Sequence, residues 1–116
     1  MTQHNAPPLA GVRIIECSML GPGAITTHLA DLGADVIKVE PPSGDPNRRT
    51  GPSRHPNMSA MHMNINRSKR SVTLDLKTRS GQQIVQRLAA DADVVVESFR
   101  PGAIERLGLD RGRRGE

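Results

Sequence analysis

At 116 residues the chain is long enough for one small domain, and its single phenylalanine is the only aromatic side chain. The formal net charge is +4, and 13 of the 16 basic residues are arginine. The single cysteine excludes an intrachain disulfide and fits a reducing, cytoplasmic compartment, while no apolar run approaches the ~18 residues that would span a bilayer.

The first forty residues predict a strand, a helix and a second strand, after a lead-in at 1–10 that we expect to be disordered. The β-branched run at 12–17 is typical of a buried parallel strand. The Gly21-Pro22-Gly23 turn then starts a helix, because proline is tolerated in the first turn of a helix. A second apolar strand is expected at 35–40. The helix is expected to pack through one apolar stripe, formed by Ile25, Leu29 and Leu32.

Prolines, glycines and basic residues dominate the next segment, 41–70, in which six basic residues against one aspartate give a net charge of +5. Most of it predicts a long loop, and such loops in compact domains are usually functional or disordered. Within this loop Asp45 lies close enough in sequence to pair with Arg48. The last residues of the segment include a candidate phosphate site, formed by Arg67, Lys69 and Arg70. The alternative interpretation of these three residues is a solvated basic turn.

Two further strands and two helices are predicted in the last third of the chain. The runs at 71–76 and 93–98 are apolar enough to be strands. Between them, Thr78 or Ser80 can cap an amphipathic helix. A short helix restarts after Pro101, where a proline suits the first turn.

Strands that alternate with amphipathic helices predict an α/β fold, because this order is typical of a parallel sheet with helices on its faces. We therefore expect a Rossmann-like parallel sheet flanked by helices over 11–110, with the basic segment as a long loop. The tail at 111–116 contains no apolar residue and is expected to be disordered.

A glycine turn after the first strand raises the question of dinucleotide binding. Gly21 and Gly23 fill two places of the G-x-G-x-x-G pattern, and Glu40 ends the second strand where an acid would bind a ribose. Thr26 occupies the third glycine position, however, and a short G-x-G also occurs in tight turns that bind nothing. The pattern is therefore a weak indication of NAD binding.

Four blocks carry a stronger signal through their order and spacing along the chain: PLAGVRIIE, GPGAITTHLADLGADVIKVEPPSGD, NRSKRSVTLDLK and LAADADVVVESFRPGAIERLGL. Together they resemble the N-terminal part of family III CoA-transferases of the formyl-CoA transferase type, whose fold alpha-methylacyl-CoA racemases share. The resemblance implies a Rossmann-like core that binds coenzyme A rather than NAD. It also implies an incomplete N-terminal part of a larger fold, which in the full-length family forms interlocked homodimers.

The resemblance also implies which residues contact the coenzyme. Residue by residue, these are Met19, Leu20, Leu74, Lys77, Ser98, Phe99, Arg100 and Arg106. Arg67, Lys69 and Arg70 are added on their charge alone. Phe99 suits an adenine face, although packing in the core is the commoner role of a single aromatic side chain. Pro41 stands where the family often places an arginine.

Catalysis in the resembled family runs through an aspartate carboxylate that attacks an acyl-CoA thioester and later carries the coenzyme as an enzyme thioester. That aspartate lies beyond the last matching block, and no catalytic residue is predicted in this chain. The substrates implied are an acyl-CoA and a free carboxylic acid. No metal is expected, since the histidines at 28, 55 and 62 lack metal-binding spacing.

Three alternatives stay open. A racemase-like fragment would share the glycine turn, and an inactive truncated remnant would bind the coenzyme only. Binding of nucleic acid rests on arginine content alone, without interleaved aromatic residues, and neither nucleic acid nor membrane is expected as a partner.

Overall fold

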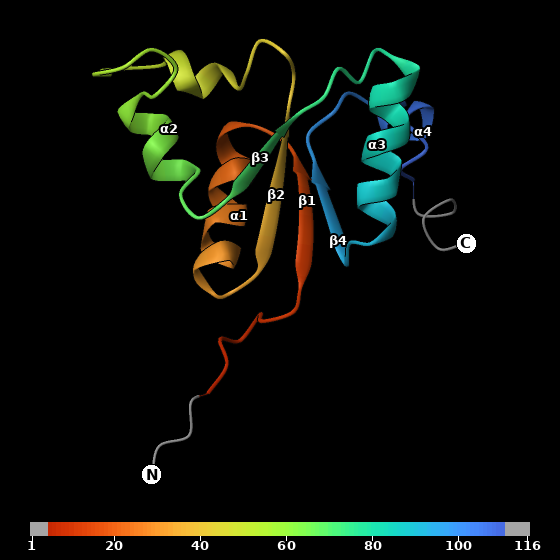
Figure 1. The fold of residues 1–116 in the computed structure, drawn as a ribbon, viewed down its shortest axis with the longest axis horizontal. Helices are drawn as coiled ribbons and strands as arrows, with labels where there is room; N and C mark the ends of the chain where they lie inside the picture. The colour runs from red at the N-terminus through yellow and green to blue at the C-terminus, as the bar shows by residue number, and fades with distance from the viewer. Residues whose placement is uncertain (1–4, 111–116) are drawn as a thin grey trace.

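The structure, a computed structural model, describes residues 5–110, with Leu20 described by its backbone only. A single sheet of four parallel strands forms its centre, in the order β3-β2-β1-β4 (Figure 1). The strands are β1 (Arg13–Cys17), β2 (Asp35–Glu40), β3 (Arg70–Thr73) and β4 (Val94–Glu97). This order is that of a Rossmann half-sheet, in which the first strand lies inside and the chain extends in both directions. The predicted α/β fold is confirmed.

Helices connect the strands, and the two longest lie against opposite sides of the sheet (Figure 1). They are α1 (Leu20–Asp31) and α3 (Arg79–Ala90). Thr78 caps α3, since its hydroxyl accepts the backbone N–H of Gly81. The predicted long loop contains two short helical segments, η1 (Pro46–Arg49) and α2 (Ala60–Ile65), and α4 (Ala103–Arg106) follows β4.

Each face of the sheet has its own apolar cluster, because successive side chains of a strand point to opposite faces. On the α3 face Ile15 and Ile37 pack with Val85 and with the two leucines after α4. On the α1 face a smaller cluster contains Ile14, Ala34 and Val36. On this face β1 and β2 are apolar near their amino ends and charged further along, at Glu16, Lys38 and Glu40.

The stripe predicted for α1 is confirmed at Leu29, which packs against the smaller apolar cluster, and is wrong at its other two positions. Ile25 is 60% exposed and Leu32 45% exposed, whereas Thr26 and Thr27 are buried. Both threonine hydroxyls donate to the carbonyl of Gly23, and Thr27 also donates to the carbonyl of Ile65. The first turns of α1 pack over a polar part of the sheet and against α2, so polar side chains turn inward there.

The lead-in predicted for 1–10 is described from residue 5 onward. The backbone N–H of Leu9 donates to the carbonyl of Leu32 at 2.9 Å, and its side chain packs against the smaller apolar cluster. The predicted tail at 111–116 lies outside the described residues. Between residues 5 and 110, no helix is long and apolar enough to cross a membrane.

Candidate functional site

A cavity of about 270 Å³ opens at the carboxyl edge of the sheet. Ligands of open α/β sheets usually bind at this edge, because the loops that follow the strands converge there. The segments after β1, β2, β3 and β4 all contribute to the cavity. Its lining residues are Cys17, Ser18, Met19, Val39, Pro41, Leu74, Asp75, Leu76, Lys77 and Phe99.

Most of the cavity wall is apolar, and the thiol within it is unreactive. Burial, together with the nearby Glu16 and Glu97 carboxylates, raises the pKa of the Cys17 thiol to about 12. The nucleophilic form of cysteine is the thiolate, so Cys17 is neutral at physiological pH and acts as a small apolar wall residue.

The polar part of the cavity lies after β3, where the chain turns into α3. The Asp75 carboxylate accepts the backbone N–H of Lys77 at 3.0 Å, and the Thr78 hydroxyl donates to the Asp75 carbonyl at 2.7 Å. These bonds fix the backbone at the mouth of the cavity. The Lys77 side chain is exposed and makes no ion pair within the described part of the chain.

The structure brings four of the eight residues implied by the resemblance together at this cavity, namely Met19, Leu74, Lys77 and Phe99. The side chain of Leu20 lies outside the described residues. Ser98 and Arg100 lie in the segment that follows β4, and Arg106 is the last residue of α4. All three are exposed, and they do not line the cavity. Their contact with a coenzyme stays a prediction.

The three basic residues predicted as a phosphate cluster point in different directions. Arg67 pairs with Asp31 at 2.6 Å, and Arg70 pairs with Asp35 at 2.7 Å. The Lys69 ammonium is buried and lies 2.9 Å from the Glu16 carboxylate. The geometry therefore separates the three side chains, and a phosphate role for each of them stays a prediction.

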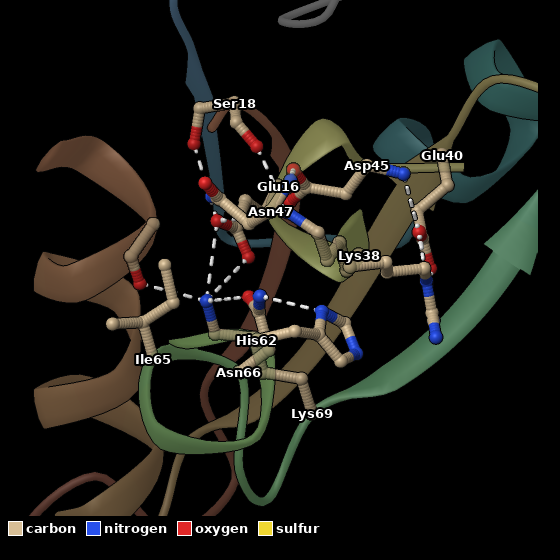
Figure 2. Close-up of polar contacts among 12 residues, drawn as sticks. Glu16, Ser18, Lys38, Glu40, Asp45, Asn47, His62, Ile65, Asn66 and Lys69 are labelled. Carbon is tan, nitrogen blue, oxygen red and sulfur yellow. Dashed lines mark hydrogen bonds and ion pairs between the residues drawn. The ribbon is translucent and has the colours of Figure 1, made fainter. Parts of the chain in front are cut away.

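Behind the cavity, on the α1 face of the sheet, lies a buried polar network that the sequence interpretation missed (Figure 2). Glu16 of β1 and Lys38 of β2 are neighbours in the strand register, and both are almost completely buried. The Lys38 ammonium lies 2.9 Å from the Asp45 carboxylate and 3.7 Å from that of Glu16. The sequence signal for this network was the presence of Glu16 and Lys38, two residues of opposite charge, within strands that are otherwise apolar.

The predicted pair of Asp45 and Arg48 is wrong, because each residue has another partner. Asp45 turns inward to the Lys38 ammonium. Arg48 donates from two nitrogens to the Glu40 carboxylate, at 2.7 and 2.8 Å. A planar guanidinium matches a carboxylate with two parallel bonds, and Arg48 binds Glu40 in this way.

Glu40 is engaged in a way that excludes the ribose role of the NAD pattern. Its side chain is buried, and it accepts bonds from Arg48, from the Ser71 hydroxyl and from the backbone N–H of Asp45. The Arg48 guanidinium, helped by the other two donors, lowers the pKa of the Glu40 carboxyl to about 2. A carboxylate held by three internal donors has little capacity left for a ribose hydroxyl.

Gly23 likewise serves the protein's own packing. A Cβ atom at Gly23 would lie 3.2 Å from the Glu16 carboxylate, tighter than most contacts of real Cβ atoms. The Gly23 carbonyl also accepts from the Lys69 ammonium at 2.7 Å. The second glycine of the G-x-G pattern therefore lets α1 approach a buried ion pair.

Histidine and acidic side chains do not converge on a metal site in the part of the chain from 5 to 110. His62 is buried on α2, and its Nδ1 lies 3.1 Å from the Asn66 amide nitrogen. Burial and the nearby Arg48 charge lower the pKa of the His62 imidazole. The lowered pKa favours the neutral imidazole, whose Nδ1 lies within hydrogen-bond distance of the Asn66 amide.

Comparison with known proteins gives consistent similarities. Residues 9–113 match the model of the family "CoA-transferase family III". The chain is 43% identical over 110 residues to the succinyl-CoA–D-citramalate CoA-transferase of Chloroflexus aurantiacus, covering 93% of this chain and 27% of that protein. It is 46% identical over 116 residues to the succinate–glutarate CoA-transferase of Agrobacterium fabrum, covering 92% of this chain and 29% of that protein.

Solved structures give the same result. The crystal structure of a CAIB/BAIF family protein from Brucella suis superposes with a TM-score of 0.86 at 40% identity, covering 95% of this chain and 30% of that chain. The present chain therefore spans less than a third of the length of each of these relatives.

Proposed function

We propose that the cavity of this chain, which belongs to CoA-transferase family III, binds coenzyme A. The enzyme of which the cavity is part moves coenzyme A between an acyl-CoA and a free carboxylic acid. The observation that supports this most directly is the cavity at the carboxyl edge, with four implied contact residues in its wall. The two relatives named above are transferases of this kind by name.

The size and lining of the cavity favour one end of the coenzyme. A volume of about 270 Å³ is near the lower limit of ligand pockets, which typically measure ~300–1,000 Å³. Leu74 and Phe99 offer apolar surface to a flat ring such as adenine. Lys77 at the mouth offers an ammonium to a phosphate. We therefore assign the nucleotide end to this cavity.

The reaction needs a nucleophile that the cavity does not supply. In the proposed sequence an aspartate carboxylate attacks the thioester carbonyl, giving a mixed anhydride and the coenzyme thiolate. The thiolate then attacks the aspartyl carbonyl and releases the acid, leaving an enzyme thioester. As the family resemblance implies, we place that aspartate in the part of the relatives' length that this chain does not span. The cavity wall itself offers the neutral Cys17 thiol and Asp75, whose carboxylate accepts the N–H of Lys77.

Two further properties follow from the same proposal. We expect the enzyme to act as a homodimer, which light scattering would test. We expect a reducing, cytoplasmic location, supported by the lone buried Cys17.

Isothermal titration calorimetry with free coenzyme A tests the binding role. Lys77→Gln should raise Kd at least about tenfold, since a charge-assisted hydrogen bond contributes about 1.5–3 kcal/mol and about 1.4 kcal/mol corresponds to a factor of ten. Arg87→Gln is the matched control, because Arg87 is an exposed cation on α3 outside the cavity wall. It should change Kd by less than about twofold.

A chimera extends this test to the complete fold. In it, residues 5–110 replace the matching segment of the Brucella suis protein. If both the folded chain and the folded chimera fail to bind coenzyme A, the proposal is refuted. Equal effects of Lys77→Gln and Arg87→Gln would refute the assignment of the cavity.

A further inference from the structure

We propose that Lys38 is a positioning residue of the coenzyme cavity, although its side chain lies on the opposite face of the sheet. One buried ammonium holds the turns that follow β1 and β2, and each of these turns forms a wall of the cavity. This inference rests on the proposed function for the identity of the ligand. The contacts by which Lys38 holds the two turns do not depend on that function.

Lys38 lies in the second half of β2, between two residues of the other face. Ile37 and Val39 belong to the apolar cluster on the α3 side, and Val39 lines the cavity. The Lys38 side chain points the other way and is only 2% exposed. Its ammonium therefore has no bulk water and depends on protein acceptors.

The first wall is held through a carbonyl. The Lys38 ammonium donates to the backbone carbonyl of Ser18 at 2.9 Å (Figure 2). Ser18 follows the last residue of β1 and, with Met19, lines the cavity. The Ser18 hydroxyl adds a bond of 3.2 Å to the Glu16 carboxylate. The strand hydrogen bonds of β1 end at Cys17, so these side-chain contacts are what hold the turn that follows it.

The second wall is held through a carboxylate. Asp45 lies 2.9 Å from the same ammonium and ends the turn that begins at Pro41, a residue of the cavity wall. That turn is closed by a bond of 2.8 Å from the N–H of Gly44 to the carbonyl of Pro41. The N–H of Asp45 donates to the Glu40 carboxylate, also at 2.8 Å. Removing the ammonium would leave Asp45 as a buried charge without its cation, and we expect both turns to shift.

Two measurements on Lys38→Met test the proposal. The first is the Kd for free coenzyme A, which should rise at least tenfold. The second needs no coenzyme: the rate at which iodoacetamide alkylates Cys17, the only thiol, should rise at least fivefold in conditions where the protein is folded. Cys17 immediately precedes the turn and lines the cavity. The Lys38 ammonium lowers the pKa of the Cys17 thiol, so its loss alone would slow alkylation, and a faster rate therefore reports on access through the wall.

Val36→Ala is the matched control for stability. Val36 lies two residues earlier on the same strand and the same face, 1% exposed, and belongs to the apolar cluster away from the cavity. It should lower stability while changing Kd and alkylation rate by less than twofold. Lys38→Arg keeps the charge and several donors, and it should restore Kd to within about threefold of the wild type.

If Lys38→Met does not fold, the same two measurements are made on Asp45→Asn. The amide keeps the shape of the side chain and removes half of the ion pair, so Kd and alkylation rate should each rise about threefold. Unchanged Kd and alkylation in a folded Lys38→Met or Asp45→Asn would overturn the inference. A wild-type protein that does not bind the coenzyme would instead refute the proposed function, and the alkylation rates would still decide the role of Lys38.

Discussion

Replacing Gly81 with alanine should displace the polar edge of the cavity. A Cβ atom at Gly81 would lie 2.0 Å from the carbonyl oxygen of Asp75 and 2.7 Å from its carbonyl carbon. Ordinary contacts are ~3.5 Å, so the first turn of α3 and the segment after β3 would have to separate by roughly 1.5 Å. The same carbonyl accepts the Thr78 hydroxyl that caps the helix, so this cap would be disturbed as well.

The magnitude follows from three terms. Overpacking costs ~1–3 kcal/mol, and a damaged N-cap costs about 1 kcal/mol. Alanine in place of glycine within a helix returns about 1 kcal/mol. We expect a net loss of about 2 kcal/mol, which corresponds to a fall in Tm of roughly 10 °C for a domain of this size. Coenzyme affinity should also fall, because Asp75 and Lys77 line the cavity.

Gly21→Ala is the control for this prediction. Gly21 lies in the first turn of α1, and a Cβ atom there would meet nothing within 4 Å. Its substitution should leave Tm unchanged or raise it slightly, since the helix gains up to about 1 kcal/mol. Thermal unfolding followed by circular dichroism measures both variants. A Gly81→Ala protein as stable as Gly21→Ala would refute the reasoning from close contact.

Two other predictions concern titratable groups. The Glu40 pKa of about 2 lies below the ordinary 4.5, so the stability due to its pair with Arg48 is present above pH 4.5 and is lost as the pH falls toward 2. Glu40→Gln should therefore be less stable than the wild type by about 2 kcal/mol at pH 7, allowing for screening at the partly exposed guanidinium, and urea titrations should show this difference vanish near pH 2. The raised pKa of Cys17 predicts that iodoacetamide modifies the folded protein at pH 8 at least ~100-fold more slowly than the urea-unfolded one; similar rates in both states would contradict a buried, neutral thiol.

The elements of the fold were predictable because the strands are strongly apolar and the turns are marked by glycine and proline. The run at 93–98 became β4, and Thr78 became the cap of α3 as expected. The inward face of α1 was not predictable by the same rule. Periodicity identifies an apolar stripe, but burial of Thr26 and Thr27 depends on what α1 packs against, and that surface comes from residues far along the chain.

Four of the ten residues that line the cavity could be reached from sequence blocks, and the rest depended on three-dimensional contacts. Met19, Leu74, Lys77 and Phe99 follow the ends of different strands, and parallel strands bring their carboxyl ends to one edge. The partners of charged residues were not accessible in this way. Charge runs show where cations are, but only the fold shows that Lys69 turns inward.

The two faces of β2 have different roles at the carboxyl edge of the sheet. Parallel strands are usually apolar on both faces, yet Lys38 and Glu40 place charges on one of them. Buried ion pairs are seldom more stabilising than apolar packing of the same volume, so stability alone does not account for the network. Ion pairs and hydrogen bonds differ from apolar contacts in fixing direction as well as distance. We interpret the charged face as the support that sets the turns after Cys17 and Glu40, while the apolar face leaves the cavity open for its ligand.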